Sequence, residues 1–168
     1  MLKLLAAPDP APAVASMAST GALVAIMPGA APQPLAVLVH LEQTHGIVPD
    51  GLRRLAVLGG ERDRLRLSKD AMRYLSAVSD GSDMLETAYR HGAAVGRDAL
   101  LIRAATVGAQ VTEDELEQVA VAAEQVFPLK AADLMPALTG PELGEALKRA
   151  ERRWIASGFT LSKADLID

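Results

Sequence analysis

The chain has 168 residues, half of them apolar, and its 17 basic and 21 acidic residues leave a formal net charge of -4. This length and apolar content support a buried core, which excludes a disordered tail. The acidic balance excludes a surface that is basic throughout, so any contact with nucleic acid has to be local. No apolar run reaches the about 20 residues that a membrane-spanning helix needs, and we expect no membrane contact.

The residue types indicate the compartment and the fold class. Cysteine is absent, which excludes disulfides and suits the cytosol. The start at Met1–Pro8 is too short for a signal peptide, so we expect a cytoplasmic protein. Aromatic residues make up only 3% of the chain, alanine is abundant, and Val and Ile rarely alternate with polar residues. We therefore predict an all-α bundle of roughly eight to ten short helices.

Proline and glycine divide the first 108 residues into short predicted helices. Met1–Ala7 is apolar and uncapped, which predicts the last turns of a helix that begins before Met1. Asp50 and Ser68 are typical N-cap residues, and each precedes apolar residues at helical spacing. Gly96 is a predicted weak point inside its helix. The predicted helices cover residues 1–7, 10–20, 23–27, 35–45, 51–58, 69–79, 82–92 and 93–107, and the predicted inward residues include Leu52, Leu55, Ala56, Leu58, Ala71, Met72, Leu75 and Val78.

Gly108 marks the predicted boundary between two regions, and a well-signalled helix begins just after it. Thr112 and Glu115 have the i, i+3 spacing of a capping box, in which each side chain bonds the other residue's backbone N–H. Pro128 is predicted to stop this helix, because proline cannot continue the backbone hydrogen bonding. The predicted buried stripe of the helix consists of Leu116, Val119, Ala120, Ala123 and Val126.

A second helix of this region is predicted to begin at Gly140-Pro141, because proline suits the first helical position. Its apolar residues recur at helical spacing, which places them on one buried stripe, and Trp154 is the expected core anchor. Its basic residues point away from that stripe. Glu145 lies within reach of two of them and is expected to pair part of their charge. The stripe consists of Leu143, Leu147, Ala150 and Trp154, and the basic residues are Lys148, Arg149, Arg152 and Arg153.

The sequence contains no recognisable chemical centre. His40 and His45 are five residues apart and His91 is remote, so no pair has the i, i+4 spacing with which one helix face binds a metal. Phosphate-binding glycine loops, nucleophile elbows and paired aspartates are absent. We therefore predict no catalytic residue and no metal ligand in this chain.

Basic residues are the remaining candidates for function. A glycine turn that opens a helix, followed by exposed cations, can hold a phosphate through backbone N–H groups and side-chain charge together. A capped surface helix with solvated charges explains the same pattern, and both interpretations stay open on the residues alone. A second basic concentration, for which solvation is at least as good an explanation as RNA contact, consists of Arg62, Arg64, Arg66, Lys69 and Arg73.

The order of elements from Phe127 to Ile167 resembles the C-terminal end of the bacterial CCA-adding tRNA nucleotidyltransferases, which are grouped with bacterial poly(A) polymerases. The start of the chain, Leu2–Pro10, is similar to the point where the neck of that family passes into its helical body. The resemblance implies the end of a neck and a helical body at 1–108 and a helical tail at 109–168. The elements that carry it are Phe127-Pro128-Leu129-Lys130, Asp133-Leu134, Gly140-Pro141-x-x-Gly144, Leu147, Trp154-Ile155, Gly158-Phe159 and Asp165-Leu166.

The family implies a division of labour. Its catalytic head, with metal-binding carboxylates, and most of the neck that selects CTP and ATP are missing here, so Mg²⁺ and nucleotides would bind outside this chain. We expect an inactive fragment with no cofactor of its own, whose partners are tRNA and the head, not DNA. The link Pro136–Thr139 departs from the more glycine-rich turn of many relatives. The resemblance implies tRNA phosphate contacts at Lys130, Gly140, Gly144, Lys148, Arg152, Arg153 and Lys163.

Two other functions are compatible with the residues. One is a helical protein-interaction module, in which apolar grooves bind a partner helix and the charges serve only solubility. The other is a degenerate stand-alone enzyme, which would extend a tRNA lacking its 3′ end in the presence of CTP, ATP and magnesium. We expect no such extension.

Overall fold

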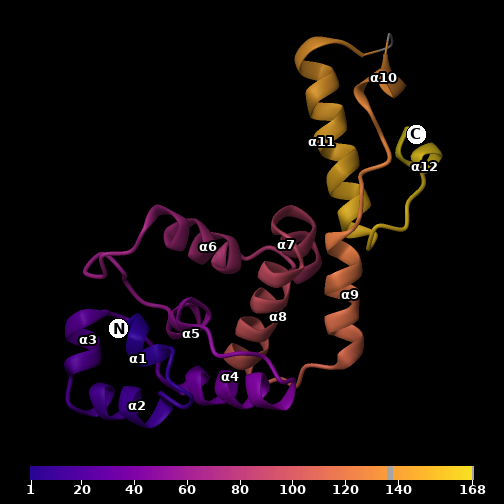
Figure 1. Ribbon diagram of the computed structural model, residues 1–168. Helices are drawn as coiled ribbons and strands as arrows, with labels where there is room; N and C mark the ends of the chain where they lie inside the picture. The colour runs from indigo at the N-terminus through magenta and orange to yellow at the C-terminus, as the bar shows by residue number, and fades with distance from the viewer. Residues whose placement is uncertain (136–137, 168) are drawn as a thin grey trace.

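The computed structural model describes residues 1–135 and 138–167, and over these ranges the chain is all-α (Figure 1). Twelve helices and no strand occur in the described residues, in agreement with the predicted fold class. None of these helices combines the length and the apolar character needed to cross a membrane. The helices are α1 Leu2–Leu5, α2 Ala11–Ser19, α3 Ala22–Ile26, α4 Gln33–Thr44, α5 Gly51–Leu58, α6 Lys69–Ser79, α7 Met84–His91, α8 Ala93–Val107, α9 Glu113–Ala123, α10 Ala131–Leu134, α11 Gly140–Ala156 and α12 Lys163–Ile167.

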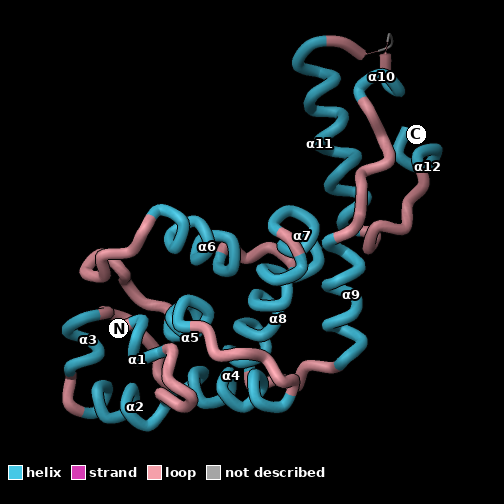
Figure 2. Tube along the Cα trace, in the orientation of Figure 1, coloured by secondary structure: helices cyan, strands magenta, loops and turns pink. Residues whose placement is uncertain are grey.

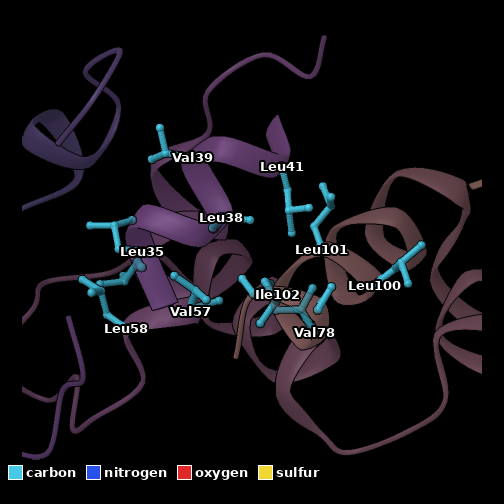
Figure 3. Packing of buried hydrophobic residues seen from close by; sticks show 14 of the residues in the cluster. Leu35, Leu38, Val39, Leu41, Val57, Leu58, Val78, Leu100, Leu101 and Ile102 are labelled. Carbon is cyan, nitrogen blue, oxygen red and sulfur yellow. The ribbon is translucent and has the colours of Figure 1, made fainter. Parts of the chain in front are cut away.

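Helices α1–α9 form what we call the main bundle, with α8 at its centre. Helix α8 packs against α4, α5, α6, α7 and α9. Leu38, Leu55, Leu75 and Leu101 are at most 1% exposed there, and Figure 3 shows how α4 and α8 bring leucines together. Burying one such side chain contributes about 2 kcal/mol. The core thus links helices that are far apart in sequence.

Local capping signals fix where several helices begin. The Asp50 carboxylate accepts the backbone N–H groups of residues 52 and 53, both at 2.8 Å, and the Ser68 hydroxyl accepts that of residue 71. Thr112 and Glu115 form the predicted capping box. Helix α7 begins two residues later than predicted, because Asp83 is its N-cap. These side chains satisfy N–H groups that the first helical turn leaves unpaired.

Gly96 lies inside the unbroken helix α8, and a Cβ there would lie 2.4 Å from the Cβ of Ala88, so the missing side chain lets α7 and α8 approach closely. Three residues that were predicted to be buried are exposed. Met72 is 49% exposed and faces solvent, and Ala120 of α9 is exposed as well. Helix α9 ends at Ala123, five residues before Pro128, and Val126 beyond it is 81% exposed. The spacing of apolar residues therefore overestimated the buried surface at these positions.

Residues 127–135 and 138–167 form what we call the arm. Helix α11 rises away from the main bundle, with α10 and α12 beside it (Figures 1 and 2). The arm has a small core of its own, made of Leu129, Ala150, Trp154 and Leu166. Helix α9 belongs to the region predicted as a tail at 109–168, yet it contributes to the core of the main bundle.

An aromatic cluster joins the arm to the main bundle. Tyr89 of α7 meets Trp154 edge-on with ring centroids 5.5 Å apart, and Phe159 lies 4.9 Å from Trp154 on another side. Phe127 lies 5.5 Å from the same indole. The Tyr89 hydroxyl also donates to Glu151 of α11 at 2.9 Å. Four of the five aromatic residues of the chain thus lie at this one joint.

The end of α11 directs one of these rings. The backbone N–H of Gly158 donates to the Ile155 carbonyl at 2.9 Å, and that of Phe159 donates to the Trp154 carbonyl at 3.0 Å. Both Gly158 and Phe159 have positive φ, 67° and 66°. This left-handed conformation is costly for phenylalanine. It turns the chain back so that the Phe159 ring packs against Trp154.

Candidate nucleic-acid interface

Helix α11 has the buried stripe that its sequence predicts. Gly140, with φ of 58°, opens the helix and Pro141 occupies its first turn. Trp154 is 3% exposed and Ala150 is 5% exposed, while Leu147 is half-buried against them. Trp154 is therefore a core anchor, as expected. The rest of the helix circumference is left to polar and charged side chains.

Four basic side chains share the exposed surface of α11, which we call the outer face: Lys148, Arg149, Arg152 and Arg153. Residues four apart on a helix lie one above the other, so these side chains form two neighbouring rows. Each row carries two cations one helical turn apart.

The four basic side chains of the outer face differ in their hydrogen-bond and ion-pair partners. Lys148 Nζ lies 3.0 Å from Glu145 Oε1, as the sequence predicted, and this hydrogen bond lowers the pKa of Glu145. Arg153 donates to the Asp165 backbone carbonyl at 3.1 Å. Within the described residues, the side chains of Arg149 and Arg152 make no hydrogen bond or ion pair with the protein. Arg149 is thus a candidate that the predicted site left out.

Lys130 and Lys163 meet around one carboxylate. Lys163 Nζ lies 2.6 Å from Asp133 Oδ1, and the backbone N–H of Lys130 donates to Asp133 Oδ2 at 2.8 Å. The hydrogen bond from Lys163, followed by that from Lys130, lowers the pKa of the Asp133 carboxyl. The Lys163 charge is thus partly neutralised inside the arm, whereas the exposed side chain of Lys130 keeps its charge.

The two predicted glycine contacts lie toward the far end of α11. The N-cap Thr139 makes no side-chain capping bond, so no side chain covers the first N–H groups of the helix from that position. Gly144 is exposed, and a Cβ there would meet no atom within 4 Å. Packing therefore gives no reason for glycine at position 144. Residues 136–137 of the predicted link at Pro136–Thr139 lie outside the described residues.

Arg152 faces an acidic part of the main bundle. It lines a groove of 590 Å³ together with Asp83 and Glu86 at the start of α7. Asp83 Oδ2 lies 3.8 Å from Arg103, and Glu86 accepts a hydrogen bond from Arg90 at 2.8 Å. Each carboxylate of this groove is thus engaged by an arginine of the main bundle, and Arg152 faces both without a hydrogen bond or ion pair within the described residues.

The second basic concentration is engaged only in part by the protein. The Arg64 guanidinium donates to the Ala25 carbonyl. Arg73 pairs with Asp70 at 3.0 Å on the surface. Burial lowers the pKa of Arg62, whose Nε is buried without a hydrogen-bond partner. Arg66 and Lys69 complete the set and are exposed.

The most deeply buried charges lie in the main bundle, and sequence reasoning missed them. Arg53 donates to Glu42 Oε1 at 2.8 Å and to Asp98 Oδ1 at 2.9 Å, while Arg54 donates to Glu42 Oε2 at 2.8 Å. Tyr74 donates to Asp98 at 2.8 Å. Burial and the neighbouring Asp98 raise the Tyr74 pKa. Burial alone would lower the pKa of Arg53, but its two carboxylate partners outweigh it and raise the pKa.

This buried network is satisfied internally, because Arg53 and Arg54 face Glu42 and Asp98 and each has several partners. The half-exposed Arg97 adds a longer contact to Asp98 at 3.3 Å. Arg54 also donates to the carbonyls of Leu5 at 2.7 Å, of Ala7, and of Pro8 at 3.2 Å, which ties the segment after α1 to α5. Such an arrangement serves structure more than ligand binding. The available sequence signal was two consecutive arginines, Arg53-Arg54, in a short and otherwise apolar helix.

Residues 1–135 and 138–167 contain no group of three or more His, Cys, Asp or Glu side chains that could hold a metal ion. His45 instead contacts Glu113 at 2.9 Å and joins the end of α4 to the start of α9. No protein-family model, no curated protein and no solved structure matches this chain.

Proposed function

We propose that the chain is the tRNA-binding C-terminal part of a bacterial CCA-adding tRNA nucleotidyltransferase, and that the outer face of α11 holds tRNA phosphates. The observation that carries the proposal is the pair Arg149 and Arg152. Their guanidinium groups are exposed on a projecting helix and have no protein partner in the described residues. A planar guanidinium matches the geometry of a phosphate and binds it with two hydrogen bonds.

Phosphate contacts of this kind give affinity without reading sequence. Lys130 extends the positive surface. Lys148 and Lys163 are paired with Glu145 and Asp133, so each can bind a phosphate only by sharing or giving up that ion pair. Arg153 is hydrogen-bonded to the Asp165 carbonyl through one N–H group. On this proposal the chain orients tRNA. Nucleotidyl transfer, with its Mg²⁺, CTP and ATP, belongs to the catalytic head of the family.

Fluorescence anisotropy with a labelled tRNA lacking its 3′ end tests the proposal. We compare the wild-type chain with R149Q/R152Q at 50 and 200 mM salt. Removing two phosphate contacts reduces the slope of log K against log salt by about 1.5 to 2, and weakens binding about tenfold at the lower salt. The control K3Q/R103Q removes the same charge from exposed positions of the main bundle that belong to neither basic candidate set, and should leave the slope nearly unchanged.

Two results would contradict the proposal. Equal losses in both double variants would mean that binding follows net charge and not the outer face. Absence of tRNA binding by the wild-type chain at 50 mM salt would remove autonomous RNA binding altogether. It would leave the protein-interaction module as the better explanation, for which apolar grooves and not cations are the binding surface.

A further inference from the structure

A cleft lies on the flank of α11 where α10 and α12 pack against it. Its volume is 260 Å³. This exceeds the about 30 Å³ taken by one water molecule. It lies below the about 300 Å³ at which pockets for drug-sized ligands begin. The cleft thus suits one small organic group. Its apolar wall includes Leu134, Leu138, Ala150 and Leu166, and its charged rim consists of Arg149 and Arg153.

The two arginines of the rim are one helical turn apart, so both can reach one anion. Arg149 makes no bond to the described residues. Arg153 uses Nη2 for the Asp165 carbonyl and keeps its other N–H groups. An anion at this rim would therefore meet two guanidinium groups without first breaking a carboxylate pair.

Three carboxylates near the rim are already engaged. Asp165 accepts the Ser162 backbone N–H at 2.8 Å and the Ser162 hydroxyl at 2.6 Å. Asp133 is held by Lys163 at 2.6 Å, and Glu145 is held by Lys148 at 3.0 Å. Glu142 lines the neighbouring pocket with Arg149 and has no ion pair within the described residues. The rim therefore presents two arginines with one unengaged carboxylate nearby.

We propose that this cleft takes a single unstacked RNA nucleotide, with its base against the apolar wall and its phosphate on Arg149 and Arg153. The inference rests on the proposed function, and it specifies that one nucleotide of the bound RNA occupies the cleft. The combination of an apolar wall with two cations favours a ligand that is both flat and anionic. Unstacked RNA bases pack on apolar surfaces and on guanidinium planes.

The test uses the whole chain with ¹³C-labelled Ala, Leu and Ile methyl groups and ¹⁵N-labelled arginine, titrated separately with AMP, CMP and inorganic phosphate and followed by NMR. We expect both nucleotides to shift the methyl signals of Ala146, Ala150 and Leu138, whereas phosphate shifts only the Nε–H signals of the arginines. Nucleotides that leave the cleft methyls unchanged, or that act only as phosphate does, would overturn the inference.

A cavity-filling variant sharpens the test. A146L adds an apolar group to the cleft without changing charge, and should weaken nucleotide binding at least tenfold while phosphate binding persists. The control A120L places the same side chain at an exposed position of α9, away from the cleft, and should have no effect. Unchanged nucleotide binding by A146L would refute the assignment. If the wild-type chain binds tRNA but nucleotides leave the cleft signals unchanged, the inference fails and the proposed function stands. If the wild-type chain does not bind tRNA, the proposed function itself is rejected.

Discussion

Replacing Arg54 by methionine should remove a large part of the stability of the main bundle. Arg54 is 1% exposed and bonds Glu42 and three backbone carbonyls near the start of the chain. Methionine retains much of the side-chain volume but leaves one carboxylate oxygen of Glu42 and these carbonyls with fewer partners. Breaking a buried ion pair in this way costs about 3 to 5 kcal/mol. For a chain of this size that corresponds to a fall in Tm of about 6 to 20 °C.

Urea unfolding followed by circular dichroism at pH 7 measures this loss. The control R73M removes an arginine whose pair with Asp70 is exposed on both sides, 77% and 86%, and should cost less than about 1 kcal/mol. A combined variant, R54M/E42M, should lose less than the sum of the two single variants, because the cost of breaking the Arg54–Glu42 pair is counted once, while Arg53 loses its bond to Glu42 equally in E42M and in the double variant. A loss below about 1 kcal/mol for R54M would refute the view that the network is essential to stability.

Two further predictions concern other parts of the chain. G96A should destabilise the main bundle by about 1 to 3 kcal/mol, because the added methyl group would overlap Ala88. G144A should stabilise α11 by up to about 1 kcal/mol, because its methyl group meets no neighbour and alanine favours the helix. Thermal unfolding of both variants measures these changes. The lowered pKa of Asp133 means that its contribution to stability is present above the ordinary value of 3.8 and is lost as the pH falls below it. D133N should therefore weaken the arm at pH 7 and reduce the further loss on acidification, and urea midpoints at pH 7 and pH 3 measure both effects.

Helix starts were predictable where one capping residue stands out, but not at α7, where Ser82 and Asp83 are adjacent candidates and Asp83 is the cap. Asp50, Ser68 and Thr112 cap their helices as expected, since capping depends on residues only two or three positions away. The buried stripe of α11, with Trp154 as its anchor, was predictable for the same reason. Helical periodicity is local information and does not need the tertiary fold.

Burial that depends on distant partners was not predictable. The burial of Arg53 and Arg54 requires Glu42 from α4 and Asp98 from α8, which the fold supplies and no local pattern reveals. The tight crossing at Gly96 likewise depends on where α7 passes. The sequence identified the cations of the outer face and their partner Glu145 on the same helix. It did not reveal the Asp165 carbonyl that accepts from Arg153 or the Asp133 carboxylate that holds Lys163.

The position of the only tryptophan makes the joint between the arm and the main bundle directly observable. Trp154 is 3% exposed and is surrounded there by Tyr89, Phe127 and Phe159, while the fifth aromatic residue, Tyr74, lies in the buried network. Fluorescence excited at the indole therefore reports on undocking of the arm, and helical circular dichroism reports mainly on the rest. Coincident transitions would identify one cooperative unit, and an earlier fluorescence change would identify an arm that detaches before the main bundle unfolds.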